Sequence, residues 1–270
     1  MQTQQHPGTA LVTGASSGIG AVYADRLARA GHDLILVARN RQRLEALAKR
    51  ITDDTGRSVE IVTADLTDKQ DLARVETVLR TDASITLLVN NAGVGAAAPL
   101  LNSDVDAMDA LLAINVNAPM RLAYAAAPGF VARGGGTIIN IASIVAVGPE
   151  ILNGVYGGSK AFVLAFSQSL HHELADKGVR VQAVLPGATA TEFWDIAGLP
   201  VHNLPDTTVM TTEDMVDAAL AGYRAGELVT IPSLPNAADW DAYEAARQVL
   251  MPNLSHAKPA SRFGLARIAA

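Results

Sequence analysis

Short apolar runs recur along this chain with helical stretches between them, and this alternation constrains its fold more than any other feature of the sequence. The runs predict strands near 9–13, 33–38, 58–64, 85–90, 136–142, 179–185 and 228–231. Strands that alternate with helices in this way pair in parallel through right-handed crossovers, so that helices cover both faces of the sheet. The sequence therefore predicts an α/β fold with a single doubly wound parallel sheet of about seven strands.

Length and composition limit the classes of protein to which the chain can belong. Its 270 residues are 49% hydrophobic and show no linker, which favours one domain over 1–270. A net charge of −6 with scattered Lys and Arg argues against a nucleic-acid surface. The sequence has no cysteine, no apolar run of the roughly 18 residues that span a membrane, and no signal-peptide pattern in residues 1–6. We therefore expect a cytoplasmic protein without nucleic-acid or membrane partners.

A glycine-rich turn follows the first predicted strand and precedes a helical stretch from about Ala21 to Ala30. Gly14 permits a tight turn, Gly18 lets a pyrophosphate approach the backbone, and Gly20 lets the helix pack closely on the strand. The free N–H groups at the start of the helix favour an anion. An ordinary strand-to-helix connection is the alternative, but strand, turn and helix together predict a dinucleotide-binding Rossmann fold. The residues of this turn that we expect to contact the cofactor are Gly14, Ser16, Ser17, Gly18, Ile19 and Gly20.

Tyr156 and Lys160 lie four residues apart on a predicted helix from about Val155 to Ala175, and Ser143 lies thirteen residues before Tyr156. Residues at the first spacing share one face of a helix, so the Lys160 ammonium can lie beside the Tyr156 phenol. One cation at about 4 Å and an effective dielectric of about 20 contributes ~4 kcal/mol, which predicts a phenol pKa near neutrality. Such a phenol suits general acid/base catalysis, and Ser143 can hold the substrate oxygen against it. The alternatives are a chance Tyr-x-x-x-Lys spacing and a serine that only ends a strand.

The end of the second predicted strand indicates which nicotinamide cofactor the chain prefers. An NAD site usually places a carboxylate about 20 residues beyond the glycine turn to bind the ribose 2′-hydroxyl, and this chain has none there. Arg39 stands at that position, and a planar guanidinium can bind a 2′-phosphate through two hydrogen bonds. The alternative is a solvated arginine that opens a charged helix. We predict NADP(H), with Arg39 on the 2′-phosphate and Arg41 assisting.

Several further motifs occur in order along the chain. They are Thr13–Gly20, Asn90–Gly93, Asn115, Ser143, Tyr156 with Lys160, and Pro186–Gly187 followed by Thr189 and Thr191. On these motifs the chain resembles the short-chain dehydrogenase/reductase family, in its NADP-preferring branch, along roughly its first 230 residues. It departs from the family pattern at Gly158, where alanine is more common, and glycine there is expected to loosen the helix slightly.

The resemblance implies cofactor contacts beyond the glycine turn. Asp65, beside Leu66, would reach the adenine amino group; its alternative role is to cap the helix that starts near Asp68. The other implied contacts are Asn91, Ala92 and Gly93 on the adenosine ribose, Tyr156 and Lys160 at the nicotinamide ribose, and Pro186, Gly187, Thr189 and Thr191 on the nicotinamide and the phosphates.

Two asparagines, Asn115 and Asn117, interrupt an apolar helical stretch near 107–127. Asparagine is unfavourable inside a helix, so the pair suggests a backbone irregularity or a polar role. The resemblance implies that Asn115 holds a water that links Lys160 to solvent, and Asn117 is the rival candidate. No cluster of His, Cys or carboxylates in the sequence has metal-ligand spacing, so we expect no catalytic metal.

Residues 188–211 form the least regular segment, in which glycine and proline interrupt apolar side chains. We expect a substrate lid that suits an apolar carbonyl compound, and ordinary packing is the alternative. The tail 232–270 matches no motif and could cover the site or a neighbouring subunit. The helices near 107–127 and 155–175 are apolar on more than one face, which suggests a partner; burial within one chain is the competing explanation. The resemblance implies that these two helices form the interface of a homodimer or homotetramer.

The sequence thus predicts an NADP(H)-dependent oxidoreductase that transfers hydride between the nicotinamide and a ketone, an aldehyde or a secondary alcohol. Asn115, Ser143, Tyr156 and Lys160 would be catalytic, with Tyr156 as the general acid/base. A 3-oxoacyl-thioester reductase is a second reading, although the sequence shows no surface for an acyl carrier. A non-catalytic NADP(H)-sensing module is the third, and the intact acid/base residues argue against it.

Overall fold

The computed structural model describes residues 7–265; residues 1–6, where the sequence shows no signal-peptide pattern, and 266–270 lie outside the described residues. The chain divides into two compact units, Met1–Ser233 and Leu234–Ala270. The first unit holds a large sheet and the helices that cover it, and the second holds the C-terminal helix α9 (Ala237–Leu250). The predicted tail, 232–270, begins near the start of the second unit.

The first unit is built on a seven-stranded sheet whose neighbouring strands all pair in parallel, in the order β3-β2-β1-β4-β5-β6-β7. The strands are β1 (Thr9–Thr13), β2 (Asp33–Ala38), β3 (Val59–Thr63), β4 (Ile85–Asn90), β5 (Gly136–Ile141), β6 (Val179–Val184) and β7 (Val229–Thr230). Each strand coincides with a predicted apolar run to within one residue at each end. The predicted doubly wound parallel sheet is therefore confirmed.

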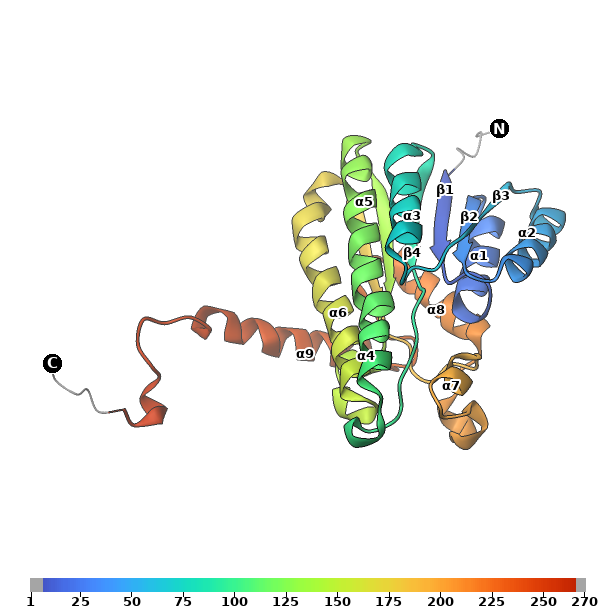
Figure 1. Cartoon of the computed structure of the whole chain (residues 1–270). Coiled ribbons are helices and arrows are strands. Elements are labelled where there is room, and N and C mark those ends of the chain that lie inside the picture. Colours follow the sequence, from blue (N-terminus) through green and yellow to red (C-terminus); the bar gives the residue numbers. More distant parts are fainter. Residues whose placement is uncertain (1–6, 266–270) are drawn as a thin grey trace. The chain divides into compact units, whose positions relative to one another are not determined.

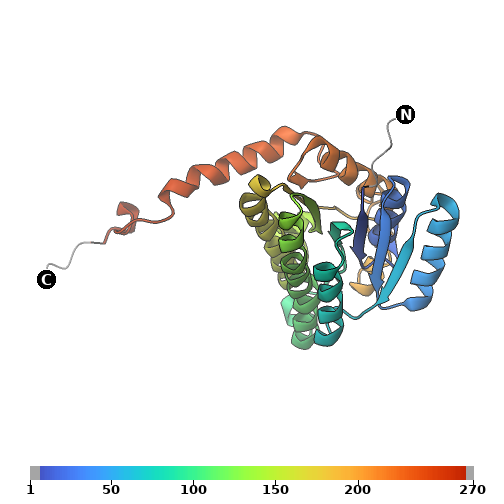
Figure 2. The same cartoon turned by 90° about the horizontal axis from the view of Figure 1, so that it is seen from above.

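Helices cover both faces of this sheet (Figure 1, Figure 2). One face carries α1 (Gly18–Arg29), α2 (Arg41–Thr55) and α8 (Thr212–Ala225), and the other carries α3 (Lys69–Thr81), α5 (Ala118–Ala132) and α6 (Gly154–Leu174). Successive residues of a strand point to opposite faces, so Val12 of β1 lies in the first core and Leu11 lies in the second. The shorter helices α4 (Val105–Leu112) and α7 (Phe193–Ile196) lie in the connections that follow β4 and β6.

Local side chains set the helix ends. Asn40 and Asp68 accept hydrogen bonds from backbone N–H groups in the first turns of α2 and α3, as capping residues do. Gly56 and Gly226 follow α2 and α8 in the left-handed conformation that ends many helices. Such signals explain why the helices begin and end close to the strands that they connect.

The strand order reverses between β1 and β4, and ligands of open parallel sheets bind at such a switch point, beyond the carboxyl ends of the strands. The predicted site residues that follow these strands are Gly14 after β1, Asn91 after β4, Ser143 after β5 and Pro186 after β6. The fold therefore brings segments that are distant in the sequence to one edge of the sheet.

The helical stretch predicted near 107–127 is interrupted by a π-helix, Ala113–Asn117, between α4 and α5. Both asparagines of the sequence pattern lie in this segment, Asn115 buried and Asn117 exposed. The predicted backbone irregularity is thus confirmed. It follows that Asn115 points into the protein at a place where the regular hydrogen-bond ladder is broken.

The second unit has no buried residue in its helix α9. Trp240 and Tyr243 pack their rings against each other with centres 5.2 Å apart, while Val249 and Leu250 are exposed. Among the described residues of the whole chain, no helix is long and apolar enough to cross a membrane.

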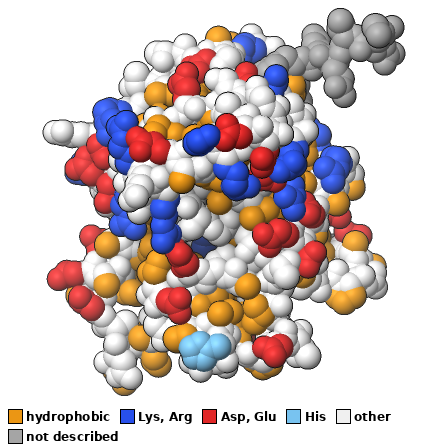
Figure 3. All heavy atoms as spheres, turned by 90° about the vertical axis from the view of Figure 1, so that its right-hand side faces the viewer, with side chains coloured by type: hydrophobic (Ala, Val, Ile, Leu, Met, Phe, Trp, Pro, Cys, Tyr) orange, Lys and Arg blue, Asp and Glu red, His pale blue; other side chains and the backbone are white. Residues whose placement is uncertain are grey.

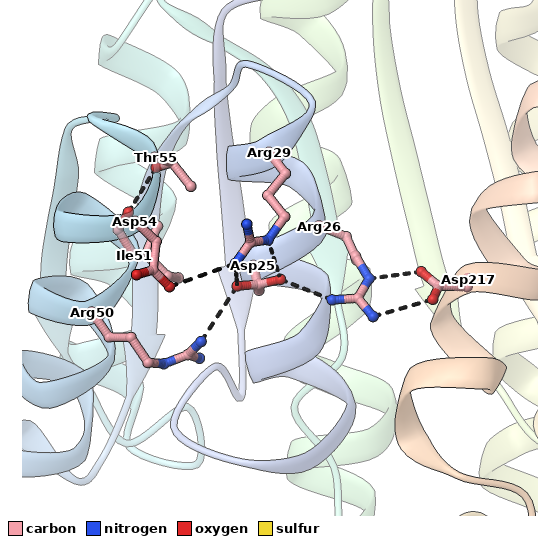
Figure 4. Close-up of polar contacts among 8 residues, drawn as sticks. All are labelled: Asp25, Arg26, Arg29, Arg50, Ile51, Asp54, Thr55 and Asp217. Carbon is pink, nitrogen blue, oxygen red and sulfur yellow. Dashed lines mark hydrogen bonds and ion pairs between the residues drawn. The ribbon is translucent and has the colours of Figure 1, made fainter.

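Asp25 of α1 is the centre of a charged cluster that joins three helices (Figure 4). Its carboxylate, 7% exposed, accepts hydrogen bonds from Arg26 and Arg29 of the same helix and from Arg50 of α2. Arg26 also binds both carboxylate oxygens of Asp217 in α8, at 2.7 and 3.1 Å. Burial alone would raise the pKa of Asp25, but the bonds from Arg29 and Arg26 and the charge of Arg50 lower it. The cluster therefore fixes α1 against α2 and α8.

We expect Asp25→Asn to lower the free energy of unfolding by about 3 kcal/mol at neutral pH, because it leaves the arginines without their buried anion. A carboxylate with a lowered folded pKa stabilises the protein above its ordinary pKa, and this contribution is lost as the pH falls through the folded value. The difference from wild type should therefore shrink in acid, which urea unfolding at several pH values measures. Asp53→Asn is the control, because its exposed 2.6 Å pair with Lys49 should contribute less than about 1 kcal/mol. Equal losses in both variants would contradict this role of Asp25.

Candidate active site

The glycine turn after β1 has the shape of a phosphate cradle. Gly14 and Gly18 have φ values of 64° and 53°, in the left-handed region that favours glycine. A Cβ atom on Gly20 would lie 2.3 Å from the Gly14 carbonyl oxygen, so α1 can approach the turn only without a side chain there. Ser17 precedes α1 and its hydroxyl caps no N–H group of that helix. The open N–H groups and the bare backbone fit a pyrophosphate.

Thr13, the last residue of β1, and Asn91, directly after the neighbouring strand β4, stabilise this turn. The Asn91 side-chain amide donates to the carbonyl oxygens of Thr13 and Gly14, at 2.9 and 3.2 Å. In return, the Thr13 hydroxyl accepts hydrogen bonds from the backbone N–H groups of Asn91 and Ala92, at 3.0 and 3.1 Å. The bracing role of Thr13 was missed in the sequence, where its place at the end of β1 was the one available signal.

Three arginines follow β2, and their surroundings differ. Arg41 pairs with Glu45 at 2.7 Å, and Arg43 binds both carboxylate oxygens of Glu192 at 2.7 and 3.1 Å. Arg39 is exposed directly after the strand, and within residues 7–265 no ion pair involves it. Of the three, Arg39 therefore has the guanidinium that is most available to a ligand phosphate.

Asp65 follows β3 and binds Thr67, whose N–H and hydroxyl donate to one carboxylate oxygen at 2.9 and 2.7 Å. These two bonds, and more weakly the charge of Arg39, lower the pKa of Asp65. The cap of α3 is Asp68 rather than Asp65, since Asp68 accepts from the first N–H groups of that helix. The alternative capping role for Asp65 is therefore wrong, and Asp65 with buried Leu66 lies beside Arg39.

Ser143, Tyr156 and Lys160 are all buried in the wall of one cavity of about 810 Å³ that also reaches the glycine turn. The Lys160 ammonium donates to the Ile141 carbonyl oxygen at 3.0 Å and lies 5.9 Å from the centre of the Tyr156 ring. The Ser143 hydroxyl accepts from the Val145 N–H at 3.3 Å. The structure thus brings the three predicted catalytic side chains together at the end of β5.

Burial changes the expected charge states of this pair. It raises the pKa of Tyr156 to about 12, and a hydrogen bond with Ser143 offsets only part of that rise. It also lowers the pKa of Lys160 to about 8. The prediction of a near-neutral phenol is wrong for this structure, because it counted the attraction between the two charged forms without the cost of removing both from water.

The fold should carry a measurable cost for the buried Lys160 ammonium. Its folded pKa lies below that of the unfolded chain, so stability rises with pH as this proton leaves, between about 8 and the ordinary value of 10.5. We expect the free energy of unfolding of wild type to gain up to about 3 kcal/mol relative to Lys160→Met across this range. Urea unfolding of both proteins at a series of pH values measures the difference. A difference that does not change with pH would contradict the buried cation.

Hydrogen bonds of its side chain fix Asn115 close to Lys160. Its carbonyl oxygen accepts from the Val94 N–H at 2.9 Å, and its amide donates to the Val94 carbonyl oxygen at 2.8 Å and to the Ser159 hydroxyl at 3.2 Å. A Cβ atom on Gly93 would lie 2.9 Å from Asn115 Oδ1 and 3.6 Å from Lys160 Nζ, so all three residues are close. The Asn115 side chain is therefore fully engaged with Val94 and Ser159.

Asn153 caps the helix that carries Tyr156, a role missed in the sequence. Its carbonyl oxygen accepts from the N–H groups of Val155 and Tyr156, at 2.8 and 3.4 Å, and its amide donates to the Ala98 carbonyl oxygen at 2.6 Å. Asparagine just before a helical pattern is a cap signal that could have identified it. Asn153 therefore fixes the start of α6 to the segment that follows β4.

The segment after β6 closes the cofactor side of the cavity. Pro186, Gly187, Thr189 and Thr191 all line it. A Cβ atom on Gly18 would lie 3.1 Å from the Thr191 methyl group, which places this threonine against the glycine turn. The Thr191 hydroxyl also accepts from the Phe193 N–H at 3.4 Å, so Thr191 contacts the start of α7 as well as the glycine turn.

Apolar side chains of the predicted lid, 188–211, form much of the remaining wall. Those that line the cavity are Phe193, Trp194, Ile196, Leu199, Leu204, Val209 and Met210. Val94, Val145 and Leu152 face them from the segments after β4 and β5. On the face shown in Figure 3, charged side chains crowd the upper part of the surface. Away from the glycine turn, apolar side chains therefore form much of the cavity wall.

These features together define a class of protein: doubly wound α/β proteins with a glycine-rich turn at the switch point and a buried Tyr–Lys pair in the wall of the same cavity. Residues 8–197 match the family model described as short chain dehydrogenase. The chain therefore belongs to the short-chain dehydrogenase family and is an oxidoreductase.

Known proteins resemble the chain over most of its length. A solved short-chain dehydrogenase from Sphingobium yanoikuyae, in complex with NADPH, has 51% identity and a TM-score of 0.92 over 94% of this chain and 99% of that one. A solved bulky-bulky ketone specific alcohol dehydrogenase from Comamonas testosteroni has 46% identity and a TM-score of 0.88 over 96% and 99%. A very-long-chain 3-oxoacyl-CoA reductase from Anas platyrhynchos is 35% identical over 193 residues, which cover 70% of this chain and 62% of that protein.

Proposed function

We propose that this protein is an NADP(H)-dependent oxidoreductase that interconverts bulky apolar ketones and their secondary alcohols. One observation carries the proposal: Ser143, Tyr156 and Lys160 are buried together in the wall of a single cavity of about 810 Å³, with the glycine turn on one side and apolar side chains on the other. A dinucleotide and an apolar carbonyl compound would therefore meet at the Tyr156 phenol.

The chain offers contacts for each part of NADP(H), which supplies the hydride when bound. The glycine turn would hold the pyrophosphate, and Arg39 would hold the 2′-phosphate because its guanidinium is not engaged in an ion pair among the described residues. The similar Sphingobium yanoikuyae enzyme binds NADPH, which supports this choice. The further proposed contacts are Asp65 and Leu66 with adenine, Asn91, Ala92 and Gly93 with its ribose, Lys160 with the nicotinamide ribose, and Pro186, Gly187, Thr189 and Thr191 with the nicotinamide and phosphates.

Tyr156 would give its proton to the carbonyl oxygen, and Ser143 would hold that oxygen. With a pKa of about 12, the phenol is protonated at neutral pH, which is the state that an acid needs for ketone reduction. Lys160 would stabilise the phenolate left behind, since its ammonium lies close to the ring in a buried site. A water held by Asn115 would then return the proton from solvent.

The apolar side chains of the cavity support a ketone with a large apolar substituent. Side chains from the lid and from the segments after β4 and β5 offer hydrophobic contact on several sides of Tyr156. The similar Comamonas testosteroni enzyme is specific for bulky-bulky ketones. The 3-oxoacyl-thioester alternative has support from the 35% identical reductase, which the chain matches over a smaller share of that protein's length. We therefore place it second, and an NADP(H)-sensing module third.

We also propose a homo-oligomer formed through α5 and α6. Tyr124 of α5 is 71% exposed and stacks on Phe166 of α6, with ring centres 6.4 Å apart. Phe162 stacks on the same ring at 5.6 Å. Such an aromatic row on the surface is typical of an interface between subunits.

The decisive assay follows NADPH oxidation with aryl ketones that carry one or two bulky groups, and with acetoacetyl-CoA as the thioester substrate. Tyr156→Phe should lower kcat by about 100- to 10,000-fold, because it removes the general acid and keeps the ring. Tyr223→Phe is the matched control, since its hydroxyl binds Thr137 at 2.8 Å and does not line the cavity. Full turnover by Tyr156→Phe would remove Tyr156 from the mechanism, and turnover of acetoacetyl-CoA alone would favour the thioester reductase.

Arg39→Asp should raise the Kd for NADPH by about 10- to 100-fold and leave that for NADH almost unchanged, because a charge-assisted bond to the 2′-phosphate is lost. Arg41→Asp should have a smaller effect, since Arg41 already pairs with Glu45. Fluorescence titration with the two cofactors gives both constants. Equal weakening for NADPH and NADH would defeat the assignment of Arg39.

A further inference from the structure

Phe193, the first residue of α7, sits in a space that exists only because residue 95 is glycine. A Cβ atom built on Gly95 would lie 2.2 Å from Phe193 Cζ and 2.8 Å from each Cε atom. Real Cβ atoms do not approach an aromatic ring this closely, so an alanine at position 95 would push the ring away. The position of the Phe193 ring therefore depends on a missing side chain on another segment.

The same ring lies against the proposed acid. The centres of the Phe193 and Tyr156 rings are 5.8 Å apart, with their planes tilted by 47°. Phe193 packs there with a small apolar cluster that includes Leu111 and Val145. Its ring thus covers one side of Tyr156 within the cavity.

The segment that contains Gly95 is tied both to the lid and to the start of α6. The Ala97 N–H donates to the Ala197 carbonyl oxygen of the lid at 3.3 Å. On the other side, the Asn153 backbone N–H donates to Ala96 at 3.3 Å, and its side chain donates to Ala98 at 2.6 Å. The seat of the ring is therefore held in a fixed place relative to Tyr156.

Phe193 and its neighbour Trp194 have different surroundings. Trp194 is buried and its indole N–H donates to the Thr189 carbonyl oxygen at 2.9 Å, so it anchors α7. Phe193 is half-buried, packs edge-on against Trp194 with ring centres 5.5 Å apart, and faces Tyr156. Trp194 therefore anchors α7 through its own hydrogen bond, while the Phe193 ring contributes to the wall of the cavity.

We infer that Phe193, seated on Gly95, is a specificity-determining residue that closes the substrate site beside Tyr156 and sets the size of the ketone substituent accepted there. The inference rests on the proposed ketone reduction. A small substituent such as methyl fits beside the seated ring, which keeps water from the phenol. A larger substituent must displace the ring from its seat, and thus loses the contacts that the ring makes.

The test compares kcat and KM for acetophenone, which carries a methyl group, and valerophenone, which carries a butyl group, in Phe193→Ala, Gly95→Ala and the double variant. Phe193→Ala should raise the ratio of kcat/KM for valerophenone over acetophenone by about tenfold, within the range of hydrophobic-pocket discrimination. Gly95→Ala should also shift the ratio, because the added Cβ atom displaces the ring from its seat. In the Phe193→Ala background it should change the ratio less than about twofold, because no ring remains to be displaced.

Gly158→Ala is the matched glycine control. Gly158 is exposed on α6, and a Cβ atom there would meet nothing within 4 Å. The ratio should stay at its wild-type value in this variant. An unchanged ratio in Phe193→Ala, or an effect of Gly95→Ala that is equally large with and without Phe193, would overturn the inference. If Gly95→Ala does not fold, Phe193→Leu tests the inference in its place. It should raise the ratio by less than Phe193→Ala does, because leucine fills part of the space of the ring.

A measurement that does not depend on catalysis distinguishes a failure of this inference from a failure of the proposed function. Hydrogen exchange measured by mass spectrometry should be faster over residues 193–199 in Gly95→Ala than in wild type or Gly158→Ala, because α7 loses its seat. If wild type reduces neither ketone, the proposed function fails, and the size-selection inference fails with it even where exchange shows that the seat exists. If wild type reduces both ketones and exchange in Gly95→Ala is unchanged, the inference alone fails.

Discussion

The close approach of the turn after β1 to the segment after β4 is the constraint on which the rest of the site depends. A Cβ atom on Gly14 would lie 2.8 Å from the Ala92 Cα, so the two backbones are nearly in contact. The Asn91 amide and the Thr13 hydroxyl satisfy the backbone groups at this junction. Because the junction lies where the strand order reverses, it shapes the turn in which a pyrophosphate would lie.

Much of the fold could be read from the sequence, because burial on both faces makes parallel strands apolar throughout. The run predicted at 33–38 is the strand Asp33–Ala38, and the run at 58–64 contains Val59–Thr63. The catalytic candidates were found for a different reason, since Tyr156 and Lys160 are fixed by the spacing of one helix. The regular pattern of apolar residues therefore predicted the strands, and helical spacing predicted the closeness of Tyr156 and Lys160.

What the sequence could not show depends on neighbours that are distant along the chain. The pKa of Tyr156 was predicted in the wrong direction because burial is a property of the folded site. The relation of Gly95 to Phe193 joins segments almost a hundred residues apart and leaves no local pattern. Likewise, Arg39, Arg41 and Arg43 look alike in the sequence, and their acidic partners distinguish them only in the structure.

The ion pair between Arg43 and Glu192 connects two helices that are distant along the chain. Arg43 belongs to α2, and Glu192, which lines the cavity, directly precedes α7, so the pair joins α2 to the start of α7. Both side chains are about half exposed, at 49% and 58%. Exposed pairs of this kind contribute little free energy and are screened by salt. Salt in the surrounding solution should therefore weaken this ion pair and leave the hydrogen bond of the buried Trp194 indole intact, so that ionic strength would change how firmly the start of α7 is held to α2.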